Sequence, residues 1–291
     1  MNSNSLNAGA SLGPLSYVLG AGVIPQILLA IVLTALLYIL LLSAEIIYTN
    51  VVQVTSTRVD LIPITITSNK SKEFEQNPAQ QNHVLLPHSD NEHTGVEFSY
   101  AFFLFVNNNN FSSQDDGFQH ILHKGNRTPY PLMSPGVFMK NNINTMRIYV
   151  NSSTTWNNYV DIENVPIGKW VHIGVVAQGN AVEIYINGNI AKKLNMQNGV
   201  IYQNFGNLYV FKTEKLKLDP ITIPSMKGEP FVVVGSMNGQ MSRLTYFNYA
   251  LSYTEIQSLV DEGPSAITDT QMMDQPPYLR DSWWVSNSGQ Y

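Results

Sequence analysis

An apolar stretch near the N-terminus differs from everything after it. Residues 23–42 read "VIPQILLAIVLTALLYILLL" and contain no charged side chain. At 1.5 Å per residue this run makes about 30 Å of α-helix, which matches the hydrocarbon core of a bilayer. A soluble helix of this length is rarely apolar on every side. The pattern predicts one transmembrane helix from Val23 to Ala44, preceded by an N-terminal segment, 1–22.

The same stretch lacks the marks of a cleaved signal peptide. No Lys or Arg precedes it, its apolar run is too long, and Leu42 occupies a position before Ala44 where cleavage needs a small residue. We therefore interpret it as an uncleaved, single-pass anchor. Basic residues follow the helix, beginning at Arg58, and the positive-inside rule then places the C-terminal bulk on the cytoplasmic side.

Beyond residue 50 the apolar positions alternate with a period of two. The stretch "VVQVTSTRVDLIPITITS" predicts a first strand within a connecting region, 45–83. Short apolar runs then recur between turn signals: "VEFSYAFFLFV", "FQHILHKG", "GVFMK", "TMRIYVN", "WVHIGVVA", "AVEIYING", "FVVVGSM" and "MSRLTYFNYAL". One late stretch, "SYTEIQSLVDEG", has a helical pattern. Many short strands at this spacing predict an all-β, antiparallel β-sandwich over 84–262, followed by a C-terminal tail, 263–291.

A three-strand meander is the clearest local prediction. Apolar residues alternate along 170–177 and again along 181–186, so each strand has one apolar face. Gln178-Gly179-Asn180 supplies the first turn. Asn187-Gly188 supplies a two-residue turn of type I′, which requires positive φ at both positions.

These residues carry a resemblance to a known family. Trp170-X-His172, followed by a hydrophobic strand and Tyr185-X-Asn187-Gly188, is similar to the core signature of the laminin G-like, concanavalin A-like lectin/glucanase jelly rolls. The resemblance implies a jelly-roll sandwich. It also implies that His172 is a strand residue beside Trp170, hydrogen-bonded for structure.

The resemblance continues at both ends of the predicted sandwich. The segment "GQMSRLTYFNYALSYTEI" resembles the last strand of the family, its "ALS-X-X-E-I" motif and the short helix that follows. The segment "FSYAFFLFV" resembles an early strand of the family, with Phe103 or Leu104 in place of the usual Trp. The match covers about Val84 to Glu262, and this fold hosts lectins, hydrolases and inert scaffolds.

Composition narrows the function classes. Charged residues make up only 13% of the chain, the net charge is −5, and the isoelectric point is near 5.6. No basic face is expected, which argues against a nucleic-acid-binding protein. The chain has no cysteine, which favours a reducing compartment and excludes thiol catalysis and Cys-ligated zinc.

No catalytic residue is predicted. A glycosidase of this fold needs paired carboxylates along one strand, and only Asp161 and Glu163 have such a spacing, without a third acid after them. We therefore interpret the pair as an exposed strand edge before Pro166. No Gly-X-Ser-X-Gly elbow is present either, so we expect no enzyme and no cofactor.

Histidines and acids give only weak metal candidates. His83, His88 and His93 recur every five residues, and His120 and His123 are three apart on an expected strand. Neither spacing is the i, i+4 helical pattern of a zinc site, so we predict surface or cross-strand histidines, not ligands.

Calcium is the usual ion of this fold. The acidic pair Asp115-Asp116 on the loop "NNNNFSSQDDG" could bind Ca²⁺ or a sugar hydroxyl. A solvated connector turned by Asp-Gly is the competing interpretation, and no metal site is assigned.

Aromatic residues outside the strands indicate contact surfaces. Trp156 and Tyr159 lie in an Asn-rich region and could stack on a sugar ring. The tail is richer in aromatics than a solvated tail would be, and such residues anchor protein interfaces. Its expected contact residues are Tyr278, Trp283, Trp284 and Tyr291. A tail that folds back onto its own sandwich is the alternative.

Three functions remain open at this point. The first is a non-enzymatic, membrane-anchored structural or interaction protein, which resembles a minor capsid component joining an internal virion membrane to a protein shell. Its partners would be the bilayer and other capsid proteins, with a short connection from Ile46 to Thr57. The second is a glycan-binding surface lectin, and the third is a glycoside hydrolase.

Overall fold

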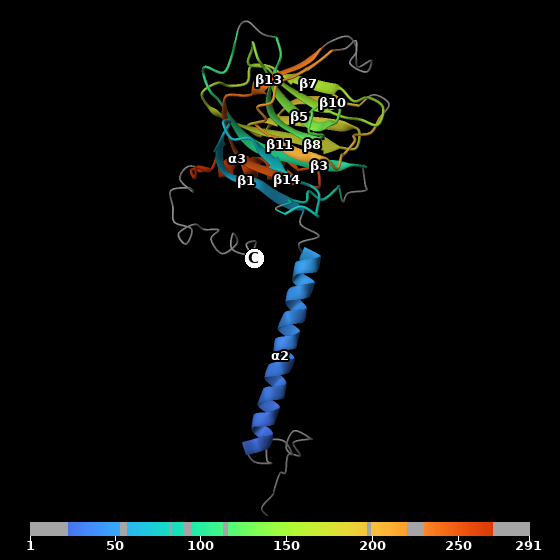
Figure 1. Ribbon diagram of the computed structural model, residues 1–291, viewed down its shortest axis with the longest axis vertical. Helices are drawn as coiled ribbons and strands as arrows, with labels where there is room; N and C mark the ends of the chain where they lie inside the picture. Colours follow the sequence, from blue (N-terminus) through green and yellow to red (C-terminus); the bar gives the residue numbers. More distant parts are fainter. Residues whose placement is uncertain are drawn as a thin grey trace, which may run out of the picture. The chain divides into compact units, whose positions relative to one another are not determined.

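The structure is a computed structural model, and it describes residues 23–52, 57–81, 83–89, 95–112, 116–196, 199–219 and 230–269. The chain divides into two compact units, 1–56 and 57–291. Each unit is described by itself (Figure 1).

The described part of the first unit is a long helix, α2 (Val23–Val52). The helix ends eight residues beyond the predicted boundary at Ala44, so the connection expected from Ile46 to Thr57 is wrong over 46–52, which is helical. Neither Gly nor Pro occurs between Gln26 and Val52, and nothing local therefore ends the helix earlier. Every described side chain from Ile31 to Ala44 is exposed.

Within the part of the chain that the structure describes, no helix is both long enough and apolar enough to qualify as a membrane span. The transmembrane segment predicted over 23–44 is therefore present as a helix but is not confirmed as a membrane span.

The second unit is a sandwich of two β-sheets, which confirms the predicted all-β, antiparallel fold. One sheet, called sheet A, has six strands that pair in this order: β1 (Arg58–Thr67), β14 (Gly239–Phe247), β3 (Glu97–Val106), β8 (Trp170–Gln178), β9 (Ala181–Ile186) and β10 (Asn189–Asn195). All neighbours in sheet A are antiparallel. The first and last strands of the unit, β1 and β14, lie side by side.

The other sheet, called sheet B, has eight strands. Six pair in the order β12 (Leu216–Leu218), β13 (Phe231–Ser236), β4 (Phe118–Gly125), β5 (Met133–Lys140), β6 (Met146–Val150) and β7 (Asn158–Ile162). The other two are β11 (Asn207–Val210), which pairs with the second half of β4, and β2 (Lys72–Phe74), which pairs with β11. The β13–β4 contact is parallel, and the other pairs of sheet B are antiparallel.

The main core lies between the sheets and follows the strand period. On β3 the residues Phe98, Tyr100, Phe102 and Leu104 are buried in it, at alternate positions. Sheet B faces them with residues such as Val137 and Ile148. Burial of these large side chains is the main driving force for folding of the domain.

Helix α3 (Tyr253–Glu262) packs on the opposite face of sheet A. Ser252 caps its first turn, and the Glu255 carboxylate accepts from the Ser252 backbone N–H at 2.8 Å, which makes a capping box. Ile256 is fully buried against Val176 and Tyr185 of the sheet. The helix predicted by "SYTEIQSLVDEG" is confirmed, and its apolar face explains why Tyr185 is buried on the side away from the main core.

The meander β8–β9–β10 forms as predicted. Asn187 and Gly188 have φ values of 48° and 81°, the positive pair that a type I′ turn requires. A Cβ atom on Gly188 would lie 2.4 Å from Nε2 of Gln257, which donates a hydrogen bond to the Gly188 carbonyl at 2.8 Å. The turn is thus held by its own backbone preference and by α3.

The Gly188→Ala substitution should destabilise the domain. The left-handed backbone costs an L-residue about 1–2 kcal/mol, and displacement of Gln257 costs about 1 kcal/mol more through its lost hydrogen bond. Chemical denaturation of Gly188→Ala, Gln257→Ala and the double variant measures both. The glycine substitution should cost about 1 kcal/mol less in the Gln257→Ala background. Equal costs in the two backgrounds would contradict the contact.

Candidate functional site

The outer face of sheet B, the face turned away from the main core, carries a second cluster of buried side chains. It consists of Tyr130, Met133, Phe138, Tyr149, Phe231 and Val233, with Phe118 packed against it. The aromatic rings meet largely edge to face, which is the favourable arrangement for their quadrupoles. Because sheet B has apolar side chains on both faces, its outer face is a candidate surface for binding a ligand.

Strand register explains which side chains share this face. Residues that pair directly across antiparallel strands point to the same side. Val137 pairs with Ile148, and both enter the main core. The next pair, Phe138 and Arg147, must therefore point outward, and Arg147 in turn pairs with Asp161 on β7.

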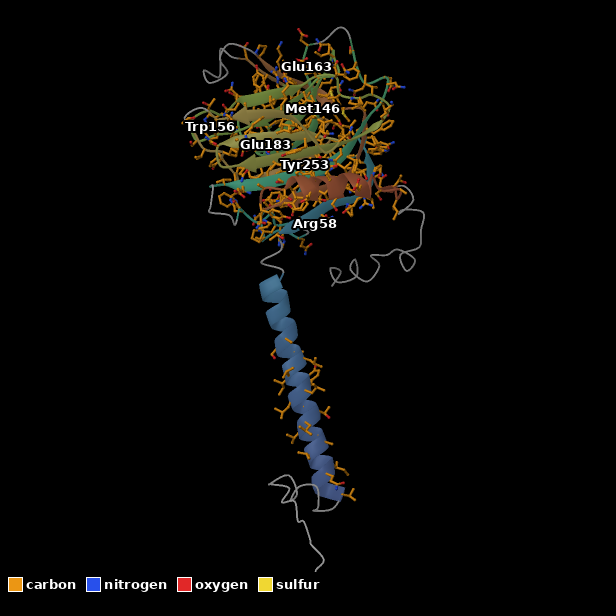
Figure 2. All side chains as sticks on the ribbon, turned by 180° about the vertical axis from the view of Figure 1, so that it is seen from behind. Arg58, Met146, Trp156, Glu163, Glu183 and Tyr253 are labelled. Carbon is orange, nitrogen blue, oxygen red and sulfur yellow. The ribbon has the colours of Figure 1, made fainter. Side chains whose placement is uncertain are left out.

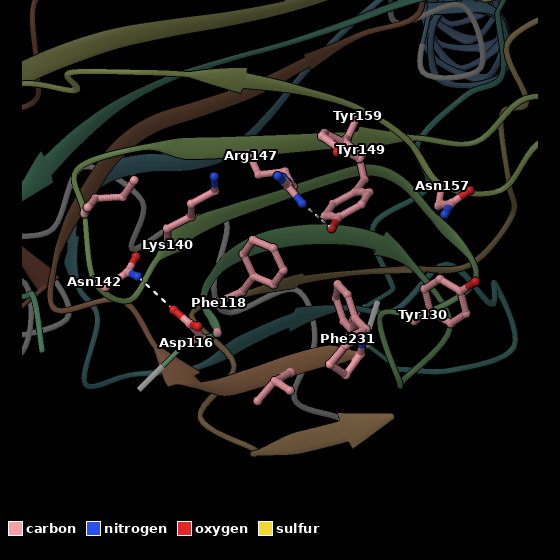
Figure 3. A pocket seen from close by; sticks show the side chains of 14 residues that line it. Asp116, Phe118, Tyr130, Lys140, Asn142, Arg147, Tyr149, Asn157, Tyr159 and Phe231 are labelled. Carbon is pink, nitrogen blue, oxygen red and sulfur yellow. Dashed lines mark hydrogen bonds between the residues drawn. The ribbon is translucent and has the colours of Figure 1, made fainter. Parts of the chain in front are cut away.

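A pocket of about 400 Å³ lies over this outer face (Figure 3). Its aromatic lining includes Phe118, Tyr149, Tyr159 and Phe231. Figure 3 shows these rings between two polar ends. The volume is near the lower end of the range for small-molecule sites, and the mixture of aromatic walls with a few polar groups is typical of them.

One end of the pocket is polar and charged. Asp116, Lys140 and Asn142 lie there, and Asn142 Nδ2 donates a hydrogen bond to Asp116 Oδ1 at 2.9 Å. The other end contains Asn157 and the ring of Tyr130. A ligand in the pocket would thus meet donors and acceptors at both ends and rings between them.

Arg147 is held by a carboxylate and by aromatic rings. Its Nε and Nη2 donate to the two carboxylate oxygens of Asp161 at 2.7 and 2.8 Å, a bidentate pair. Lys140 Nζ lies 3.1 Å from the same carboxylate. The guanidinium carbon is 3.8 Å from the centroid of the Tyr159 ring and 5.2 Å from that of Phe118. These contacts fix the Tyr159 ring against a rigid cationic support.

The contacts of Asp161 and Arg147 favour the charged form of both side chains. Burial disfavours the charged form of Asp161, but hydrogen bonds from Arg147 and Lys140 outweigh it and lower the pKa of Asp161. Burial likewise opposes the charge of Arg147, yet hydrogen bonds with Asp161 and Tyr149 raise the pKa of Arg147. Burial raises the pKa of Tyr149 to about 12, so its hydroxyl stays neutral. Two cations, Lys140 and Arg147, are balanced by two carboxylates, Asp161 and Asp116.

Of the two predicted ligand residues, Tyr159 lines the pocket and Trp156 does not. Tyr159 lines the pocket and is 43% exposed. Trp156 is equally exposed but does not line the pocket; its ring lies on the preceding loop, edge to face with Tyr202. The aromatic tail residues Tyr278, Trp283, Trp284 and Tyr291 lie outside the described residues, and their partner role stays a prediction.

Of the acidic pair predicted as a calcium candidate, the structure describes only Asp116. Asp116 is described and lies at the polar end of the pocket, whereas Asp115 lies outside the described residues. In the described part of the chain, no group of three or more His, Cys, Asp or Glu side chains is placed to hold a metal ion. Asp116 instead accepts a hydrogen bond from the side-chain amide of Asn142.

The carboxylate spacing considered for glycoside hydrolysis is not assembled. Strand β7 ends at Ile162, so Glu163 lies beyond it and is exposed, while Asp161 is bound by Arg147 and Lys140. A general acid needs a raised pKa, and that of Asp161 is lowered.

His120 and His123 form a buried, hydrogen-bonded pair. A register shift after His120 brings the two rings to within 2.6 Å, Nε2 to Nδ1. The Lys212 backbone N–H donates to His120 Nδ1 at 3.0 Å, so His120 donates from Nε2 to His123, and His123 donates from Nε2 to the Asn126 carbonyl at 2.9 Å. This chain of donors needs both rings neutral. Burial lowers the pKa of both, that of His123 to about 4. The surface position considered for this pair is wrong, because both rings are fully buried.

The other histidines have structural surroundings. His83 is exposed, and His93 lies outside the described residues. The rings of His88 and Phe205 are tilted by 31°, with their centroids 3.8 Å apart. His172 is buried against Phe103, and its ring Nδ1 has no hydrogen-bond partner among the described residues. Its predicted structural hydrogen bonds are instead made by its backbone, with Asn187. Burial lowers the pKa of His172 to about 4.

Most of the pocket could not be found from the sequence. Phe118 and Phe231 lie on parallel neighbouring strands more than a hundred residues apart in the chain, and no local pattern joins them. Arg147 gave one usable signal: it is a lone charge within the apolar run "TMRIYVN". A charge at an alternate position of a strand faces away from the core, which is where the structure has it.

The family of the chain follows from a comparison with known domains. Residues 78–257 match the Laminin_G_3 family, described as the concanavalin A-like lectin/glucanases superfamily. This span is more than half of the 291 residues. The chain belongs to this family. Membership confirms the resemblance read from Trp170, His172 and the Tyr185-X-Asn187-Gly188 turn. Among curated protein sequences, the concanavalin A-like chain has no match.

Solved structures similar to the concanavalin A-like domain are distant. The ligand-binding domain of botulinum neurotoxin serotype D in complex with N-acetylneuraminic acid has a TM-score of 0.43 at 9% identity, covering 70% of this chain and 51% of that one. The binding domain of botulinum neurotoxin DC in complex with rat synaptotagmin II has a TM-score of 0.39 at 14% identity, covering 57% and 36%. Trypanosoma rangeli sialidase has a TM-score of 0.39 at 13% identity, covering 59% and 24%. The chain spans about half or less of each of these proteins, and likeness at this level carries no argument about activity.

The Asp161→Asn substitution should destabilise the domain by about 1–3 kcal/mol, because it leaves the Arg147 guanidinium, 11% exposed, without its carboxylate. Urea denaturation measures the change. Glu163→Gln is the matched control, since Glu163 is exposed, and it should change stability by less than about 0.5 kcal/mol. Equal effects of the two substitutions would show that the ion pair contributes nothing to the fold.

Proposed function

We propose that the sandwich is a glycan-binding domain and that the pocket on the outer face of sheet B is its binding site. The observation that carries the proposal is the combination of Tyr159, an exposed ring backed by the largely buried guanidinium of Arg147, with hydrogen-bonding groups at both ends of the pocket. The C–H groups of a sugar ring carry partial positive charge and pack on the negative face of an aromatic ring. Its hydroxyls then need donors and acceptors around the rim.

The polar end supplies both kinds of group. Asp116 offers carboxylate oxygens that accept from two neighbouring hydroxyls, while Lys140 and Asn142 donate. Membership of a superfamily named for lectins and glucanases is consistent with such a ligand. Protein partners fit the same family, but a pocket with polar groups at both ends favours a small polyhydroxylated unit over a flat protein surface.

We further propose that binding is not followed by hydrolysis. Retaining glycosidases place two carboxyl groups about 5–5.5 Å apart across the scissile bond, and inverting enzymes about 6.5–9.5 Å. Among the described lining residues, Asp116 is the carboxylate of the pocket, and Asp161 behind it is occupied by Arg147 and Lys140. A carboxylate with a lowered pKa in a bidentate pair is a poor proton donor.

The Tyr159→Ala substitution should weaken glycan binding about tenfold, which corresponds to the loss of one stacking contact of about 1.4 kcal/mol. A glycan array screened with the full chain in detergent, followed by calorimetry on the bound glycans, measures this. Tyr253→Ala is the matched control, because Tyr253 is an exposed tyrosine on α3. It should bind as the unaltered chain does. Binding unaffected by Tyr159→Ala, or no glycan bound at all, would overturn the proposal.

Helix α2 favours a second, compatible role. Its described apolar side chains are exposed on every side, and they include Ile31, Leu36 and Leu40 at 57–62%. A helix that is apolar all round is normally buried in protein or lipid. We propose that α2 anchors the binding domain in a bilayer and that the protein is located at a membrane. The location in a virion membrane and the contact with a capsid remain predictions, because the residues of α2 suit a virion membrane no better than any other bilayer.

The anchor has a direct test. The full chain, expressed in cells, should stay in the membrane fraction after extraction with alkaline carbonate, and the double variant Leu36→Arg/Leu40→Arg should appear in the supernatant, because a charge at the helix centre opposes insertion by about 2.5–3.5 kcal/mol. Ile190→Arg, an exposed apolar residue of β10, is the control and should stay in the pellet. Release of the unaltered chain by carbonate would overturn the anchor.

A further inference from the structure

Beside the pocket lies an exposed aromatic pair that the pocket does not include. Trp156 and Tyr202 are 43% and 41% exposed, and their ring centroids are 6.1 Å apart in an edge-to-face arrangement. Figure 2 shows Trp156 at the edge of the domain. Its direct neighbour in the chain, Asn157, lines the pocket. The aromatic pair therefore begins one residue from the end of the pocket that Asn157 and Tyr130 form.

A buried amide ties the aromatic pair to the pocket wall. Asn151 is fully buried, and its Nδ2 donates to the carbonyls of Trp156 and Pro131. Its Oδ1 accepts from the Met133 backbone N–H at 2.8 Å. Pro131 directly follows Tyr130 of the pocket. One side chain thus sets the position of the Trp156 loop relative to the Tyr130 wall.

Further hydrogen bonds hold the two loops of the aromatic pair together. The Ser153 backbone N–H donates to the Val200 carbonyl at 2.9 Å, and the Tyr202 N–H donates to the Asn151 carbonyl at 3.0 Å. Within the first loop, Ser152 exchanges hydrogen bonds with Thr155. The two rings are therefore placed before any ligand arrives, which lowers the entropy lost on binding.

The chemistry of these loops fits an uncharged, hydroxyl-rich ligand. The segments 151–158 and 199–206 contain no Asp, Glu, Lys or Arg, and together they are rich in Asn, Gln, Ser and Thr. The pocket itself balances two cations with two carboxylates. Aromatic faces flanked by amides and hydroxyls suit a neutral sugar, whereas a charged ligand would find no partner charge here.

We propose that the Trp156–Tyr202 pair is a second glycan subsite that continues the pocket, so that the domain binds a neutral oligosaccharide chain in preference to a single sugar. The inference rests on the proposed glycan-binding function of the pocket. The pocket of about 400 Å³ holds only a short part of a glycan chain. The next units leave it past Asn157 and stack on Trp156 and Tyr202.

The test is the dependence of affinity on chain length. Calorimetry on the full chain in detergent uses neutral gluco-, manno- and galacto-oligosaccharides of one to six units, and a sialylated oligosaccharide of matched length. In the series that binds, affinity should rise about tenfold between the shortest bound sugar and the longest. Trp156→Ala should remove this gain and leave the affinity for the shortest bound sugar within twofold, whereas Tyr159→Ala should weaken every length equally.

The outcomes separate the two proposals. Binding that Tyr159→Ala weakens, but that is independent of length and unaffected by Trp156→Ala, would overturn the second subsite and leave the pocket intact. Tighter binding of the sialylated sugar would overturn the neutral ligand class. Binding of none of these sugars would overturn the second subsite as a site for neutral oligosaccharides, and the absence of any bound glycan on the array would overturn the proposed function as well. Tyr253→Ala serves again as the control for loss of an exposed ring, and Tyr202→Ala should reproduce the effect of Trp156→Ala if the two rings act as a pair.

Discussion

Cross-strand pairing in sheet B is the constraint on which the candidate site depends. Residues that pair directly across antiparallel strands point to one side, so the strands β4 to β7 present their side chains in rows. Val137 and its partner Ile148 pack in the main core. Because side chains alternate along a strand, the next pair, Phe138 and Arg147, must point to the outer face. Two residues further along β6, the next pair on the same face is Tyr149 with Tyr159. The chemistry of the outer face is therefore a consequence of which residues the core needs.

The same constraint creates an electrostatic problem and its solution. Arg147 stands among aromatic rings with little access to water, and an unpaired guanidinium there would lose several kcal/mol of solvation. Register places Asp161 directly opposite, and the bidentate pair replaces the lost hydration. The guanidinium then supports the ring of Tyr159 from behind. One ion pair thus serves both the stability of the sheet and the geometry of the pocket.

The two sheets are treated differently on their outer faces. On sheet A, α3 covers Val176 and Tyr185 with Ile256, so this apolar surface is closed within the chain. On sheet B, the described residues form an aromatic cluster with an open pocket above it. Since an apolar surface exposed to water is unfavourable, the face that the described residues leave open is the one available to a ligand. The loops with Trp156 and Tyr202 extend that face past the end of the strands.

Local sequence determined those features whose cause is local. The apolar runs from 96 to 106 and from 170 to 177, the Asn187-Gly188 turn and the helical pattern of "SYTEIQSLVDEG" each depend on neighbours a few residues away, and each appears in the structure as predicted. The helix end at Val52 was missed because β-branched residues are compatible with both helix and strand when no Gly or Pro intervenes.

Tertiary structure alone decided the site. Phe118 and Phe231 meet because β4 and β13 pair in parallel, and the Asn151 amide joins the carbonyl of Pro131, which follows Tyr130, to the carbonyl of Trp156. Such contacts join residues far apart in the chain, and their positions follow from how two sheets pack and register, which no spacing along the sequence records.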